Sequence, residues 1–109
     1  MHGTTVSGAD IVTVLGDLDI YTSEHLRDHV TASGYTAQVL VIDLNGVAFL
    51  DSQGLACLLR IRRLLATRSA ELVLVTAQPR TLRILQIAGF HQFMRITSTV
   101  VAAIPPPAE

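Results

Sequence analysis

The chain has 109 residues, of which half are hydrophobic and 16% are charged, and its formal net charge is −1. This length suits one domain whose core folds without disulfide bonds or structural metal ions. The charge balance favours neither nucleic acid nor an acidic membrane surface as a partner. The single cysteine, Cys57, excludes an internal disulfide and cannot form a zinc site alone. No apolar run reaches the roughly 18 residues of a membrane span, and residues 1–5 lack the features of a signal peptide. We therefore expect a cytoplasmic globular protein.

Five short runs rich in β-branched and apolar residues predict strands. The first two runs are close enough to form a hairpin. The third and fourth runs are continuously apolar, which is typical of strands that are covered on both faces. The predicted strands are residues 4–7, 11–15, 39–42, 71–77 and 94–96.

Helices are predicted between these strands. Thr22 or Ser23 is expected to cap the first helix, and Thr97 or Ser98 the last. Because strands and helices alternate after the first hairpin, the fold class should be α/β, with a mixed, largely parallel sheet of four to five strands and four helices. We expect one domain over residues 1–104 and a short proline-rich tail at 105–109. The three longer helices are expected at about residues 23–32, 53–67 and 79–88, the last between Pro79 and Gly89.

The stretch most informative about function is residues 39–55, which read VLVIDLNGVAFLDSQGL. A buried strand leads through Asn45 and Gly46 to Ser52, which lies where a new helix begins. Serine is among the best helix-capping residues, so position alone favours an N-cap role for Ser52.

Three blocks of the chain resemble bacterial anti-sigma-factor antagonists of the STAS superfamily. Residues 49–55, FLDSQGL, are similar to the hallmark Phe, Leu or Met, Asp, Ser, Ser or Thr, Gly, Leu at the start of a helix. Residues 16–22, GDLDIYT, resemble the family's Gly-Glu-Leu-Asp block, and residues 79–90 resemble its later block that runs from proline to Gly-Phe. Order and spacing match from about residue 4 to 104, and the resemblance implies the STAS fold.

The resemblance also implies a function. In that family the serine after the aspartate is phosphorylated by the partner, an anti-sigma factor that is also an ATP-dependent serine kinase, and here this serine is Ser52. Many relatives carry a second Ser or Thr at the next position, where this chain has Gln53. The chain is thus expected to bind the anti-sigma factor and to free a sigma factor until Ser52 is phosphorylated. A PP2C-type phosphatase is a further expected partner.

The residues expected to contact the partner surround this serine. Asp19 has two open roles. It is either a contact to the partner, as the resemblance implies, or a turn aspartate that bonds its own backbone. Gly54 would let the partner's backbone approach closely, and Leu55 is either a core residue or an interface contact. The expected partner-binding residues are Asp19, Tyr21, Asp51, Ser52, Gln53, Gly54 and Leu55.

His25 and His29 lie four residues apart on a predicted helix, a spacing that fits zinc ligands. The glutamate that zinc proteases place after the first histidine is absent. We therefore expect both histidines to face solvent, and we predict no metal site and no cofactor.

Other function classes fit the sequence less well. A phosphoacceptor receiver domain needs a lysine, and the chain has none. A Gly-rich phosphate loop, a nucleophile elbow and a plausible acid/base carboxylate pair are all missing, so we do not expect an enzyme. The same fold as the tail of an anion transporter is disfavoured by the lack of membrane spans. The remaining alternative is a STAS scaffold or sensory-complex component with a different kinase partner.

Overall fold

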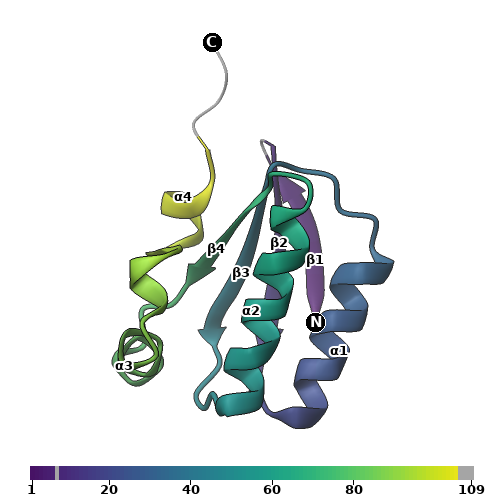
Figure 1. Ribbon diagram of the computed structural model, residues 1–109. Coiled ribbons are helices and arrows are strands. Elements are labelled where there is room, and N and C mark those ends of the chain that lie inside the picture. Colours follow the sequence, from purple (N-terminus) through teal and green to yellow (C-terminus); the bar gives the residue numbers. More distant parts are fainter. Residues whose placement is uncertain (7, 106–109) are drawn as a thin grey trace.

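The computed structural model describes residues 1–6 and 8–105, and these form one mixed five-stranded sheet with the strands in chain order (Figure 1). The first two strands pair antiparallel, and all later neighbours pair parallel. The predicted α/β class with a largely parallel sheet is therefore confirmed. The strands are β1 (His2–Val6), β2 (Ala9–Leu15), β3 (Val39–Gly46), β4 (Glu71–Val75) and β5 (Arg95–Thr97).

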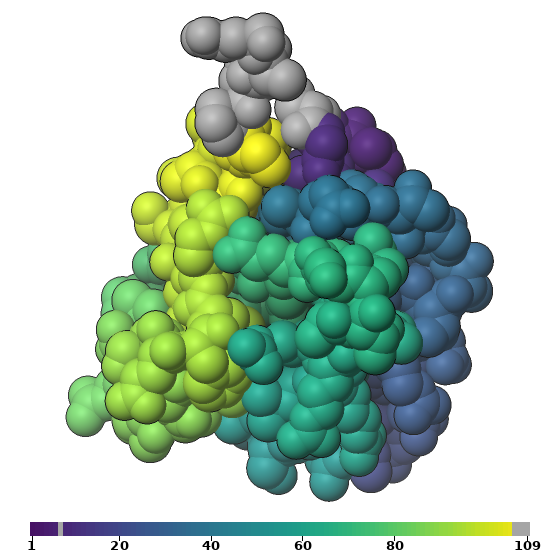
Figure 2. Space-filling view, turned by 45° about the horizontal axis from the view of Figure 1, so that its top comes forward, coloured from purple at the N-terminus to yellow at the C-terminus, as the bar shows by residue number. Residues whose placement is uncertain are grey.

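Helices connect the parallel strands, because parallel neighbours cannot be joined by a tight hairpin and need a crossover connection. α1 and α2 lie side by side against one face of the sheet (Figure 1). In the space-filling view α2 (teal) lies between α1 (blue) and the C-terminal segments from α3 onward (green to yellow) (Figure 2). None of the helices in the described ranges has the length and apolar character needed to cross a bilayer. The helices are α1 (Ile20–Ala32), α2 (Ser52–Ala66), α3 (Pro79–Ile87), the 3-10 helix η1 (Phe90–Gln92) and α4 (Val100–Ala103).

The core divides into two clusters because β2, β3 and β4 are apolar on both faces. The larger cluster lies under α1, α2 and α3, and the smaller one lies on the opposite face beside α4. Leu40, Ile42, Leu72 and Leu74 face the first, while Val39, Val41, Val73 and Val75 face the second.

The caps of the first two helices differ from the prediction. Thr22 and Ser23 lie inside α1, because its side-chain cap is Asp19. Asp51, rather than Ser52, caps α2. In both cases a carboxylate precedes the hydroxyl residue, and its charged oxygen is a stronger acceptor for the backbone N–H groups of the first turn.

The boundaries of α3 in the C-terminal half match the prediction more closely. Pro79 is the first residue of α3 and Gly89 follows its end with a φ of 81°, a left-handed conformation that glycine adopts without strain. The cap of α4 is Thr99 instead of the expected Thr97 or Ser98. Of the proline-rich tail predicted at residues 105–109, all but the first residue lies outside the described residues.

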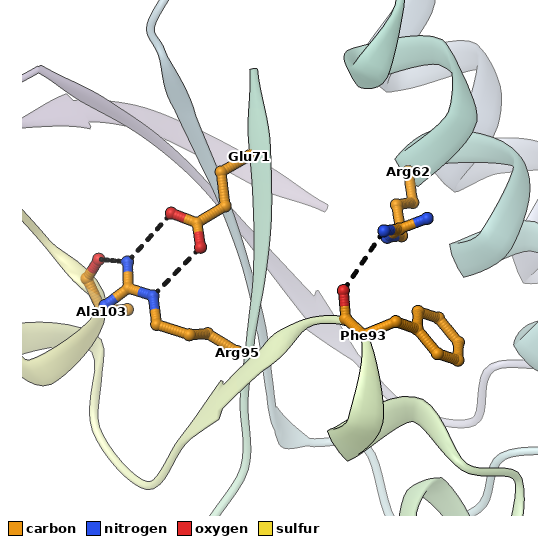
Figure 3. A network of polar contacts seen from close by, with 5 residues as sticks. All are labelled: Arg62, Glu71, Phe93, Arg95 and Ala103. Carbon is orange, nitrogen blue, oxygen red and sulfur yellow. Dashed lines mark hydrogen bonds and ion pairs between the residues drawn. The ribbon is translucent and has the colours of Figure 1, made fainter. Parts of the chain in front are cut away.

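Two arginines join the C-terminal segment to the rest of the fold (Figure 3). Arg62 of α2 donates a hydrogen bond to the carbonyl oxygen of Phe93 at 3.2 Å, and its guanidinium lies 5.0 Å from the centre of the Phe93 ring. Arg95 donates two hydrogen bonds to the Glu71 carboxylate, at 3.2 and 3.3 Å, and one to the carbonyl oxygen of Ala103 at 3.4 Å. The Arg62 contacts hold the segment before β5 against α2, and the Arg95 contacts hold β5 and α4 against β4.

Candidate functional site

The loops that follow β2 and β3 are hydrogen-bonded to each other at the carboxyl edge of the sheet. The backbone N–H of Leu18 donates to the carbonyl oxygen of Phe49 at 2.9 Å, and that of Asp51 donates to the carbonyl oxygen of Leu18 at 3.3 Å. Leu18 and Leu50 form an isolated parallel bridge, and both side chains are buried. Because the loops are paired in this way, α1 and α2 begin next to each other.

Ser52 is the first residue of α2, and it is exposed. Asp51 does the capping: its Oδ1 accepts the backbone N–H of Gly54 at 2.9 Å. The N-cap role favoured for Ser52 by position alone is therefore wrong. In residues 1–6 and 8–105 the Ser52 hydroxyl takes part in no hydrogen bond, so it is available to a second molecule.

Asp19 caps α1 in the same way. Its Oδ1 accepts the backbone N–H groups of Tyr21 and Thr22 at 3.0 and 3.1 Å, while Thr22 Oγ1 accepts the Asp19 N–H at 2.8 Å. These bonds, the Thr22 N–H foremost, hold the pKa of the Asp19 carboxyl below its ordinary value. Of the two roles left open for Asp19, bonding to its own turn is therefore observed. Contact with a partner stays a prediction.

Replacing Asp19 with asparagine is expected to flatten the pH dependence of the free energy of unfolding in acid. The lowered pKa means that the native carboxylate adds stability in full above its ordinary value of 3.8, and that this stability is lost as pH falls through the folded value. Asparagine also caps helices well, so it removes the charge and keeps the cap. Urea unfolding between about pH 2 and pH 6 measures the change.

The matched control for this prediction is Asp17→Asn, an exposed carboxylate in the same loop that does not cap the helix. In acid, the free energy of unfolding should depend more steeply on pH in Asp17→Asn than in Asp19→Asn. Equal curves for the two variants would contradict the assignment of the cap to Asp19.

Gly54 and Leu55 lie largely inside the protein. A Cβ added to Gly54 would lie 2.6 Å from both the carbonyl oxygen of Leu18 and Cδ1 of Leu50. Packing against the β2–α1 loop is therefore reason enough for a glycine, without any partner. Leu55 is half-buried and packs against the larger core cluster, so of its two open roles the core contact is observed.

Large apolar side chains are exposed around Ser52. Tyr21 is 75% exposed, and Ile20 and Phe49 are each 50% exposed. Exposed aromatic and aliphatic groups beside one another are typical of protein-binding surfaces. We call Ile20, Tyr21, Phe49, Ser52 and Gln53 the docking surface.

Ile20 and Phe49 were not among the residues predicted to contact a partner. A signal for both was present in the sequence. Each is a large apolar residue after the turn that follows a strand and within two residues of an aspartate, where neither the strand nor the helix pattern requires one.

The two histidines of α1 differ in environment. His25 is exposed, as expected. His29 is half-buried, and its Nε2 lies 2.9 Å from the Tyr35 hydroxyl. The expectation that both histidines face solvent is therefore wrong for His29, because the α1–β3 loop brings Tyr35 over its ring.

Comparison with known proteins agrees with this architecture. The family model described as the STAS domain matches residues 4–103. The anti-sigma F factor antagonist of Paenibacillus polymyxa is 28% identical over 89% of this chain and 85% of its own length. The anti-sigma-B factor antagonist of Listeria monocytogenes is 31% identical over 78% of this chain and 75% of its own length.

A solved structure is similar over almost the whole fold. The crystal structure of an anti-sigma factor antagonist from Mycobacterium paratuberculosis superposes with a TM-score of 0.84 at 27% identity. The superposition covers 94% of this chain and 87% of the other. The predicted STAS fold is thus confirmed. The chain belongs to the STAS domain family, and its relatives include anti-sigma-factor antagonists.

Proposed function

We propose that the chain is an anti-sigma-factor antagonist that binds a kinase-type anti-sigma factor, frees a sigma factor, and is switched off by phosphorylation of Ser52. The observation that carries the proposal is the Ser52 hydroxyl, which is exposed at the first position of α2 while Asp51 does the capping. The paired loops and the start of α1 also expose the apolar side chains of Ile20, Tyr21 and Phe49. A kinase can reach this hydroxyl without unfolding the helix.

The fold should tolerate a phosphate at Ser52. The first turn of a helix carries unpaired N–H groups and a partial positive charge, which favour an anion. Asp51 satisfies the N–H of Gly54 only, so other N–H groups of the first turn are left to meet the phosphate. Phosphorylation should therefore act on docking and leave the domain folded.

The added charge is large enough to expel a partner. Phosphoserine carries close to two negative charges at neutral pH, and here they would add to that of Asp51. A negative group of the docked anti-sigma factor about 5 Å from this phosphate would be repelled by roughly 3 kcal/mol per unit charge pair at an effective dielectric near 20. Since about 1.4 kcal/mol changes affinity tenfold, one such pair accounts for a loss of about 100-fold.

On this proposal the protein acts in the cytoplasm by binding and not by catalysis. A PP2C-type phosphatase is the proposed partner that resets the switch by removing the phosphate from Ser52. Asp19, Tyr21 and Gln53 are the proposed contacts beside it.

The test is incubation of the purified chain with its cognate anti-sigma factor and ATP, followed by mass spectrometry. A single phosphoryl group should appear, and it should be absent from Ser52→Ala. Because the chain has no lysine, trypsin places Ser52 and Ser33 in the same peptide, residues 28–60. Fragmentation of this peptide must therefore assign the site. Phosphate on Ser33, or on no residue, contradicts the proposal.

A further inference from the structure

A small pocket lies between α1 and α2, next to the docking surface. Its volume is about 130 Å³, enough for the head of a side chain and too small for a nucleotide. Ile20 and Gln53 belong both to the pocket wall and to the docking surface. The lining residues are Ile20, Ser23, Glu24, Arg27, Gln53, Cys57 and Arg60.

Two arginines from different helices give this pocket positive charge. Within residues 1–6 and 8–105, Arg60 of α2 forms no ion pair, and Arg27 of α1 pairs only with the exposed Asp28 at 3.7 Å. Both positive charges act on the Cys57 thiol: burial raises its pKa, and the charges of Arg27 and Arg60 oppose that rise. The positive charges of the two pocket arginines are therefore largely unpaired.

One residue of the same pocket has a buried hydroxyl. Ser23 is 7% exposed, and its Oγ has no hydrogen-bond partner in the part of the chain that the structure describes. Its backbone oxygen accepts a hydrogen bond from Cys57 Sγ at 3.3 Å, which leaves the side chain as the unsatisfied group. Buried polar groups are nearly always hydrogen-bonded, so this one indicates a ligand group that completes the site.

We propose that the pocket receives the carboxylate of an aspartate or glutamate side chain from the docked anti-sigma factor. Arg27 and Arg60 bind the carboxylate as charged donors, and the Ser23 hydroxyl donates to the same group. With Glu24 also on the wall, the lining residues carry a net charge of +1 (two arginines and one glutamate), which matches a singly charged carboxylate. This inference rests on the proposed function, since the pocket adjoins the surface that contains Ser52.

The first test measures affinity for the purified anti-sigma factor by isothermal titration calorimetry. The double variant Arg27→Gln, Arg60→Gln should bind about 10- to 100-fold more weakly than the wild type, because both charged donors are lost. Added salt should weaken the wild type more than the double variant. The matched control is Arg63→Gln, an exposed arginine of α2 outside the pocket, which should bind within about twofold of the wild type.

A Ser52→Asp variant in the same series separates the two proposals. The proposed function is supported if the wild type binds and Ser52→Asp does not. In that case, a double arginine variant that binds like the wild type overturns only the proposal that the pocket receives a carboxylate. If the wild type fails to bind, the proposed function fails.

The second test needs no partner. Sodium acetate is titrated into the isotopically labelled chain at constant ionic strength, and the amide resonances of Ser23, Gln53 and Cys57 are followed by NMR. Acetate should shift these resonances in the wild type and not in the double arginine variant. Equal shifts in both proteins would overturn the proposed carboxylate site. Tighter binding of inorganic phosphate than of acetate would overturn it as well.

Discussion

Replacing Ser52 with aspartate is expected to weaken binding to the anti-sigma factor by about 100-fold. Aspartate adds one permanent negative charge at the exposed start of α2, beside Asp51 and between the apolar groups of the docking surface. A charge in that place must be desolvated and brought against a surface that accepts a neutral hydroxyl. Calorimetric titration of both proteins with the anti-sigma factor measures the loss.

Two controls distinguish charge at this position from charge in general. Ser52→Ala removes the hydroxyl without adding charge, so it should bind within a few-fold of the wild type and resist phosphorylation. Thr36→Asp adds the same charge at an exposed loop position before β3, at the opposite edge of the parallel sheet, and should bind normally. Ser52→Asp should also melt no lower than the wild type, because a negative charge is favourable at a helix N-terminus. Wild-type affinity in Ser52→Asp would refute the switch.

Replacing Gly54 with valine is expected to lower the free energy of unfolding by about 3 kcal/mol, and replacing it with alanine by about 1–3 kcal/mol. The added Cβ would lie 2.6 Å from the Leu18 carbonyl oxygen, which is backbone and cannot rotate away. Relief requires the β2–α1 loop to move away from α2, which breaks the pairing of Leu18 with Leu50. Helix propensity alone would make alanine stabilising by roughly 1 kcal/mol, so the sign of the change tests the contact.

Arg63→Val serves as the control for the glycine variants. It places a β-branched residue at an exposed position of the same helix, and it should change stability by less than about 1 kcal/mol. Urea unfolding followed by circular dichroism compares the three variants with the wild type. A Gly54→Ala protein more stable than the wild type would show that the close approach to Leu18 is not a constraint.

Much of the fold could be predicted because its signals are local. Continuous apolar runs marked β3 and β4 as strands buried on both faces, and the structure buries their apolar side chains in two core clusters. Pro79 and Gly89 marked both ends of α3, since one lacks a backbone N–H and the other tolerates a positive φ.

The functional site was only partly predictable. The motif around Ser52 placed this serine at the start of a helix, as the structure does. Which residue caps each helix was missed, because aspartate and the nearby hydroxyl residues have similar capping propensities, and at α2 Asp51 and Ser52 are adjacent. The choice depends on where β3 ends relative to α2, and the pairing of the two loops through Leu18 settles it.

The sequence by itself determined the order of strands and helices and placed Ser52 at the start of a helix, because hydrophobic periodicity and turn residues act over a few neighbours. Only the tertiary structure decided what surrounds that serine. Gly54 packs closely against the backbone of Leu18, 36 residues earlier in the chain. The pocket contains Arg27 and Arg60, which lie on separate helices. Contacts of this kind depend on how the helices pack on the sheet, which no local pattern encodes.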